Sequence, residues 1–156
     1  MNRDAGFSIP DIIMGMTIIA VAVVGIMGVQ RNYVEQVNRT IIQTRAISLG
    51  NAVMSTIRMH RYDENASEPW SSSLGADSET MANYDDIDDY AYTSWDFSSL
   101  GYVGFDVLTK VWYVDTGTSW LDSVAGPTDF KRITVIVDHD ILSDPIVFYS
   151  LAGGGY

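Results

Sequence analysis

The hydrophobic and polar positions divide the chain into stretches of different character. Residues 12–29 read IIMGMTIIAVAVVGIMGV, and all 18 are uncharged. Apart from one threonine and three glycines, every side chain in this run is apolar. A run of about 18 or more apolar residues can cross the ~30 Å hydrocarbon core of a bilayer as a helix. The pattern therefore predicts a membrane-spanning helix near the N-terminus.

Beyond residue 29 the apolar positions become periodic. They recur in steps of three and four, which is the spacing of one face of a helix. Pro10 suits the first turn of such a helix, where a backbone N–H is not needed. We therefore predict one helix over residues 10–61, apolar all round in its first half and amphipathic in its second. The periodic apolar residues are Val34, Val37, Ile41, Ile42, Ala46, Leu49, Val53 and Ile57.

The rest of the chain predicts a small β-sheet. Residues 63–104 are rich in Ser, Gly, Asp and Pro, which is typical of loops. Residues 107–114, 132–138 and 146–151 are β-branched and aromatic with partial alternation, which predicts three strands. Short connections between them favour an antiparallel meander. The expected fold class is α+β, with the long N-terminal helix packed on a small antiparallel sheet.

Composition narrows the possible functions. The chain has no cysteine, which excludes disulfides and thiolate metal sites. Its net charge is −11, and residues 62–156 hold 17 of the 20 acidic residues but three of the nine basic ones. Such an acidic region repels phosphates, so direct nucleic acid binding is not expected. The sequence also has no nucleophile elbow and no phosphate-binding loop, so we expect no enzyme activity.

The residues before the apolar run carry the most specific motif. The chain begins MNRDAG, Phe7 follows, and Asp11 is the fifth residue counted from Phe7. A secretory signal peptide would be cut after its apolar core, whereas the Gly6–Phe7 junction lies before it. This arrangement resembles the N-terminus of type IV prepilins, in the superfamily that includes type II secretion pseudopilins. The family usually has Glu where this chain has Asp11, an aliphatic residue at Pro10, and a more basic leader.

The resemblance implies roles for the residues around the junction. A prepilin peptidase would cut between Gly6 and Phe7, and the new Phe7 amine would be methylated. The Asp11 carboxylate would pair with the Phe7 amine of a neighbouring subunit and set the register of assembly. The alternative is that Asp11 is an acid in the first turn of a helix, favoured there by the helix dipole.

The resemblance also implies an organisation for the whole chain. Gly25 and Gly28 would mark a soft segment of the helix, or would allow close packing of helices through small residues. The expected parts are a leader at 1–6, a transmembrane half-helix at 7–29, an amphipathic half-helix at 30–61, and an acidic head at 62–156.

By resemblance, the chain is expected to be a minor-pilin-like structural subunit of a type IV pilus (fimbrium) or related filament. The implied partners are other pilin subunits, prepilin peptidase and an inner-membrane assembly platform. The implied location is the bacterial inner membrane with the head in the periplasm, and then an extracellular or periplasmic filament. Three alternatives stay open: a minor pseudopilin of a type II secretion system, a major pilin, and a single-span anchored binding module.

The densest acidic cluster is NYDDIDDY, with Asp85, Asp86, Asp88 and Asp89. Closely placed carboxylates can bind Ca²⁺, which takes six to eight oxygen ligands. The spacing lacks the EF-hand pattern, and a solvated loop or a turn capped by Asp is the favoured interpretation. No other cofactor is expected. The stretch also resembles one found in minor pilins, where a structural role is implied.

Two basic residues stand at the start of the second predicted strand. Lys131 and Arg132 follow Phe130 in the segment FKRITV. Charged side chains commonly protect the open edge of a sheet from pairing with other chains. The segment resembles the penultimate strand of minor pilins and pseudopilins. The alternative is an amphipathic edge strand, in which Lys131 and Arg132 are edge-protecting charges.

Overall fold

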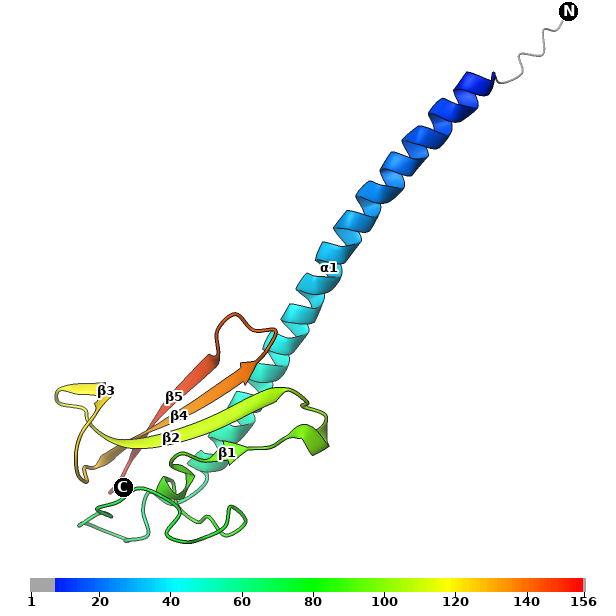
Figure 1. The fold of residues 1–156 in the computed structure, drawn as a ribbon. Coiled ribbons are helices and arrows are strands. Elements are labelled where there is room, and N and C mark those ends of the chain that lie inside the picture. Colours follow the sequence, from blue (N-terminus) through cyan, green and yellow to red (C-terminus); the bar gives the residue numbers. More distant parts are fainter. Residues whose placement is uncertain (1–7, 156) are drawn as a thin grey trace, which may run out of the picture. The chain divides into compact units, whose positions relative to one another are not determined.

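The computed structural model describes residues 8–155. Within that range the chain divides into two compact units that meet between Ile41 and Ile42, and each is described by itself. The helix α1 (Ile9–Arg58) is followed by short 3₁₀-helices and strands (Figure 1). These are η1 (Asp88–Tyr90), β1 (Ser94–Trp95), η2 (Ser98–Leu100), β2 (Phe105–Asp115), β3 (Ser119–Ser123), β4 (Phe130–His139) and β5 (Ile146–Gly153).

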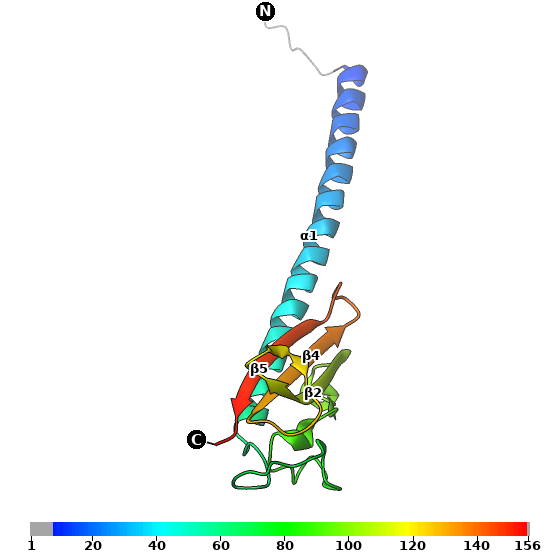
Figure 2. The same cartoon turned by 90° about the vertical axis from the view of Figure 1, so that its left-hand side faces the viewer.

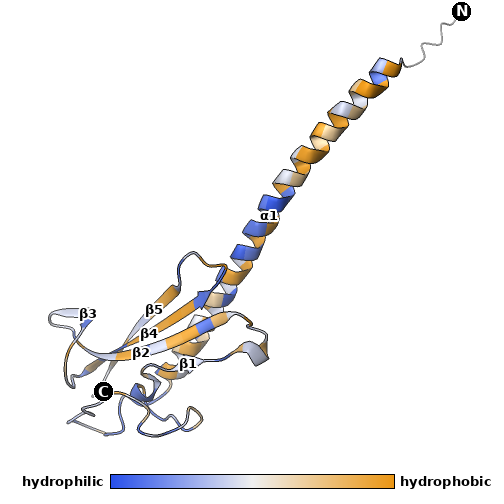
Figure 3. Cartoon of the chain, viewed as in Figure 1, coloured by the Kyte–Doolittle hydropathy of each residue, from blue (hydrophilic) through white to orange (hydrophobic). Residues whose placement is uncertain are grey.

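The first unit consists of α1 as far as Ile41. From Ile9 to Ile41 every residue except Gly15 is exposed. Hydrophobic residues predominate along the first half of this helix, and polar residues follow (Figure 3). Among residues 8–155, α1 is the one helix long and apolar enough to cross a membrane. The predicted helix is confirmed, and it ends three residues before the expected position.

The second unit contains a five-stranded antiparallel sheet. The strand order is β1-β2-β4-β5, and β3 pairs with β2 beside this path. The predicted strands correspond to β2, β4 and β5, and the α+β fold class is confirmed. The short strands β1 and β3 were not predicted. β3 falls in a stretch whose Thr, Gly and Ser residues indicate turns, and its side chains show no buried alternation.

The core of this unit lies between the sheet and the last turns of α1 (Figure 2). Burial of the apolar stripe begins at Ala46, whereas Val34, Val37 and Ile41 remain exposed. Helix and sheet approach closely at Gly50, where an added Cβ would come 2.1 Å from the ring of Phe148. The core residues of the helix are Ala46, Leu49, Val53, Met54 and Ile57, and those of the three long strands include Val107, Val111, Ile133, Val135 and Val137.

The interpretation of Lys131 and Arg132 as edge charges is wrong. β4 lies inside the sheet, between β2 and β5, and Lys131 is paired with Tyr113 on one side and Ala152 on the other. Side chains alternate between the two faces of a strand. Lys131 therefore shares the inward face with Ile133, and its side chain is fully buried. The Arg132 guanidinium donates to the carbonyl oxygens of residues 120 and 121 in β3.

Candidate functional site

Asp11 caps the start of α1. The backbone N–H and the hydroxyl of Ser8 donate to Asp11 Oδ2, at 3.1 and 2.7 Å. The N–H groups of Asp11 and Ile12 donate to the Ser8 carbonyl oxygen. An acid in this position also interacts favourably with the positive end of the helix dipole. In the single chain Asp11 thus has the capping geometry, and its side chain is exposed.

The other predicted residues of the N-terminal segment are placed as follows. Gly6 and Phe7 lie outside the described residues. α1 continues through Gly25 and Gly28, and a Cβ added at either glycine would meet no atom within 4 Å. Both glycines therefore present open surface within the chain, and the choice between a soft segment and close helix packing stays a prediction.

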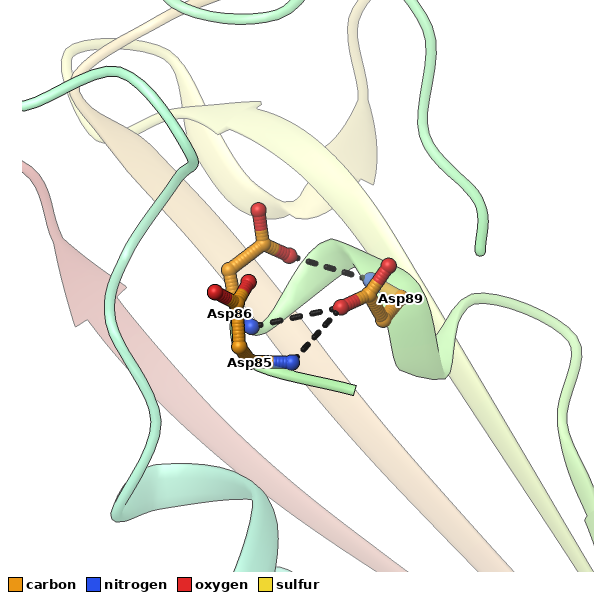
Figure 4. Close-up of side chains that lie close together, drawn as sticks. All are labelled: Asp85, Asp86 and Asp89. Atoms are coloured by element: carbon orange, nitrogen blue, oxygen red, sulfur yellow. Dashed lines mark hydrogen bonds between the residues drawn. The ribbon is translucent and has the colours of Figure 1, made fainter. Parts of the chain in front are cut away.

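Three of the four calcium candidates lie together immediately before and within η1 (Figure 4). Asp85, Asp86 and Asp89, hereafter the acidic cluster, have carboxylate oxygens within 4.8 Å of one another. Asp89 Oδ2 accepts from the N–H groups of Asp85 and Asp86, at 3.0 and 3.3 Å. Asp86 Oδ1 accepts in return from the N–H groups of Asp88 and Asp89, at 2.9 and 3.1 Å.

These reciprocal bonds form a turn capped by Asp, which is the geometry that the favoured interpretation expects. Asp85 remains exposed and forms a surface ion pair with Arg61. The fourth candidate, Asp88, does not join the acidic cluster, because its carboxylate contacts Lys131. Calcium binding at the cluster stays a prediction.

Lys131 is the centre of a buried network that sequence reasoning missed. Its Nζ donates to Asp63 Oδ2 at 2.9 Å, to the Tyr62 carbonyl oxygen at 2.7 Å, and to the Asp88 carboxylate. Lys131, Asp63 and Asp88 are 0%, 3% and 1% exposed. We refer to these three residues as the lysine centre. It joins the loop that follows α1, the 3₁₀-helix η1 and the central strand β4.

Two tyrosine rings enclose the ammonium group. Nζ lies 4.4 Å from the centroid of the Tyr62 ring and 5.2 Å from that of Tyr113, which are distances typical of cation–π contacts. The Tyr113 hydroxyl donates to the Ser71 carbonyl oxygen at 2.8 Å. Tyr113 stands directly opposite Lys131 on the neighbouring strand. The rings therefore separate the charges from solvent.

The two carboxylates of the lysine centre have different surroundings. Asp63 accepts from the N–H and hydroxyl of Ser71 at 3.0 and 2.9 Å, and from the Asn65 N–H at 3.1 Å. Burial alone would raise the pKa of Asp63, but the hydrogen bonds from Lys131, Ser71 and Asn65 outweigh it, and the pKa is lowered. Asp88 accepts from Lys131 and otherwise neighbours the Asp86 carboxyl. Burial raises the pKa of Asp88 to about 7, although Lys131 opposes the change.

One signal in the sequence could have located Lys131. It stands two residues before Ile133, in phase with Val135 and Val137, so strict alternation places it on the same inward face. No comparable signal marks Asp63, which lies in the stretch DENASEP that composition assigns to a loop. Its approach to Lys131 spans 68 positions of the chain.

No family model matches the chain, and neither a curated protein nor a solved structure does.

Proposed function

We propose that this chain is a minor-pilin-like structural subunit of a type IV pilus or a related filament. The observation that carries the proposal is the order of features at the N-terminus. The Gly6–Phe7 junction is followed by Asp11 and then by 18 uncharged residues. Those residues belong to one continuous helix, whose last turns pack on the sheet of an acidic head.

The exposed apolar surface of α1 supports an assembly role. Ile12, Ile18 and Val24 are 51%, 62% and 70% exposed, and their neighbours along the helix are exposed on every side. Apolar surface in water costs about 25 cal/mol per Å². Lipid would cover this surface before assembly, and the helices of neighbouring subunits would replace lipid in the filament. Other pilin subunits are thus the principal proposed partners.

Asp11 would provide the register of that packing. In a filament its carboxylate would meet the Phe7 amine of a neighbouring subunit after the leader is removed. An unpaired charge among apolar helices is costly, so subunits that leave Asp11 without a partner are disfavoured. The exposure of Asp11 in the single chain supports this role, because Ser8 occupies only one of its two carboxylate oxygens.

The proposal also implies how the subunit is processed and where it lies in the cell. Prepilin peptidase would cut after Gly6 and methylate Phe7, and an inner-membrane platform would extract the subunit into the filament. The head would lie in the periplasm before assembly and on the filament surface afterwards, in a role such as cell adhesion. The proposed function is structural and not enzymatic.

The proposal is tested by expressing the full chain together with a prepilin peptidase and a host filament system. We expect mass spectrometry to show removal of residues 1–6 and one added methyl group. Gly6→Val should keep the leader and be absent from sheared filaments, whereas Ala5→Val, the same class of change one residue earlier, should be processed. A wild-type chain that keeps its leader and never enters filaments would contradict the proposal.

The amount of the chain in sheared filaments separates the alternatives. Trace amounts indicate a minor pilin, and abundant protein indicates a major pilin. Complete absence with normal leader cleavage indicates a pseudopilin. A plain single-span anchor would reach the membrane equally well with or without the Gly6 substitution.

A further inference from the structure

The lysine centre places one amine and two carboxyl groups together in a site closed to solvent. The side chains of Lys131 and Asp63 are 0% exposed, and that of Asp88 is 2% exposed. Nζ is in hydrogen-bond contact with both carboxylates and with the Tyr62 carbonyl oxygen. We propose that Lys131 and Asp88 become joined by an isopeptide bond that the folded head forms autocatalytically.

The hydrogen bonds assign different roles to the two acids. Asp63 accepts from Ser71 and Asn65 in addition to Lys131, so its negative charge is held in place. A carboxylate stabilised in this way is a poor electrophile. Its oxygen lies 2.9 Å from Nζ, which places it to relay a proton. Asp88 has Lys131 as its hydrogen-bond donor and a second acid, Asp86, as its neighbour. Burial with so few donors favours the neutral acid, which nucleophiles attack.

The reaction balances without any further reagent. The Lys131 ammonium first passes a proton to the Asp88 carboxylate, which gives a neutral amine and a neutral acid. The amine nitrogen then attacks Asp88 Cγ, and a C–N bond forms. Asp63 takes the second proton from this nitrogen and passes it to the hydroxyl of Asp88. The C–O bond breaks, one water leaves, and Asp63 returns to its carboxylate form.

The buried site favours this reaction in two ways that water does not: it solvates the two charges poorly, and it holds the reacting groups together. Free amines and acids ionise, and solvent stabilises both charges, whereas this buried pair would lose two poorly solvated charges on forming an amide. The fold also holds the amine against the acid, and well-oriented groups reach effective molarities of about 10⁵–10⁸ M. The rings of Tyr62 and Tyr113 cover Nζ and limit the return of water.

The bond would reinforce a head that has no disulfides. It would join η1 to the central strand β4 across 43 positions of the chain. Residues 59–104 contain few regular elements and pack on the sheet through this contact among others. A covalent link at this place restricts the unfolded chain and ties the segment to the sheet, as a disulfide would.

Peptide mapping of the wild-type chain tests the proposal directly. The purified full chain is denatured in detergent solution and digested with trypsin, which cuts after Lys and Arg. We expect peptide 62–110 joined to peptide 111–132, lighter than the two together by one water. Cleavage after Lys131 should be absent, because its side chain is an amide. Separate linear peptides 62–110 and 111–131 would overturn the proposal.

The two lysines of the chain provide an internal control. An amine-reactive label applied to the denatured protein should modify Lys110 and leave Lys131 unmodified. Equal labelling of Lys110 and Lys131 would overturn the proposed isopeptide bond.

Two variants test the role of Asp63. Asp63→Asn removes the proton acceptor and keeps both reacting groups, so we expect it to yield separate peptides. The matched exposed variant Asp85→Asn should yield the joined peptide. A fully joined peptide from Asp63→Asn would overturn the role of Asp63 as base.

Discussion

Replacing Lys131 by methionine would leave Asp63 and Asp88 buried without a positive partner. Methionine has nearly the length of the lysine stem, so the change removes the charge without opening a large cavity. In the wild-type head Nζ contacts both carboxylates at a position that is fully buried. The variant therefore isolates the electrostatic contribution of the lysine centre.

The expected loss is large relative to the stability of a small domain. Removing one partner of a buried ion pair costs about 3–5 kcal/mol, because the remaining charge is uncompensated. Domains of ordinary size unfold with a free energy of about 5–15 kcal/mol. We therefore expect Lys131→Met to lower the free energy of unfolding by about 3–5 kcal/mol. This figure describes the ion-paired head. In a head that carries the proposed isopeptide bond, loss of the bond replaces this electrostatic contribution.

The loss should depend on pH in a defined direction. Burial already raises the pKa of Asp88 to about 7 against the opposing charge of Lys131, and the variant removes that opposition. A group whose folded pKa is raised contributes stability below its unfolded pKa of about 4 and loses it as pH rises through the folded value. The difference in stability between wild type and variant should therefore be smaller at pH 5 than at pH 8.

Urea unfolding of the detergent-solubilised full chain measures these changes. All four tryptophans lie between residues 70 and 120, so tryptophan fluorescence reports the head alone. Lys110→Met on β2 is the matched control, since it makes the same change at a half-buried position of the same sheet. It should alter stability by no more than about 0.5 kcal/mol. A Lys131→Met head that unfolds at the wild-type midpoint at pH 8 would refute the reasoning.

Three further predictions follow from the other contacts. Gly50→Ala forces a Cβ into an aromatic ring of β5 and should lower head stability by about 1–3 kcal/mol in the same urea assay, whereas Gly25→Ala, where the Cβ meets nothing within 4 Å, should not. Asp11→Asn keeps a side-chain oxygen that can cap the helix but removes the charge, so both Asp11→Asn and Asp11→Ala subunits should be missing from sheared filaments. If the Asn variant enters filaments as the wild type does, capping the helix is the only role of Asp11. The melting temperature of the chain should be the same in calcium as in EDTA, because backbone N–H groups already bind carboxylate oxygens of the acidic cluster. A higher melting temperature in calcium would instead establish a metal site.

Much of the fold was predictable because its signals are local. The uncharged run at 12–29 and the three-and-four spacing after it predict α1, and the β-branched segments predict the three long strands. The extent of helix burial was not predictable, since Val34 and Ile41 have the same spacing as Leu49, yet they are exposed and Leu49 is buried. Periodicity shows which residues share a face and cannot show how far along the helix that face is covered.

The lysine centre was not predictable for a different reason. A lone lysine in a strand is usually solvated, and only its two acidic partners explain its burial. Those partners lie 43 and 68 positions away, in segments whose composition indicates loops. The acidic stretch at 85–89 therefore forms a capped turn, which is local, and also pairs through Asp88 with the distant Lys131, which no local sequence pattern predicts.

The position of β5 in the sheet has a consequence for synthesis of the chain. β5 is the last strand, it pairs with the central strand β4, and its Phe148 ring packs on Gly50 of α1. The head therefore cannot close until Gly153 has left the ribosome. At about 5–20 residues per second, roughly 6–25 s separate the emergence of Val29 from that of Gly153. This topology favours a co-translational order in which the apolar helix is complete while the head is still an open chain.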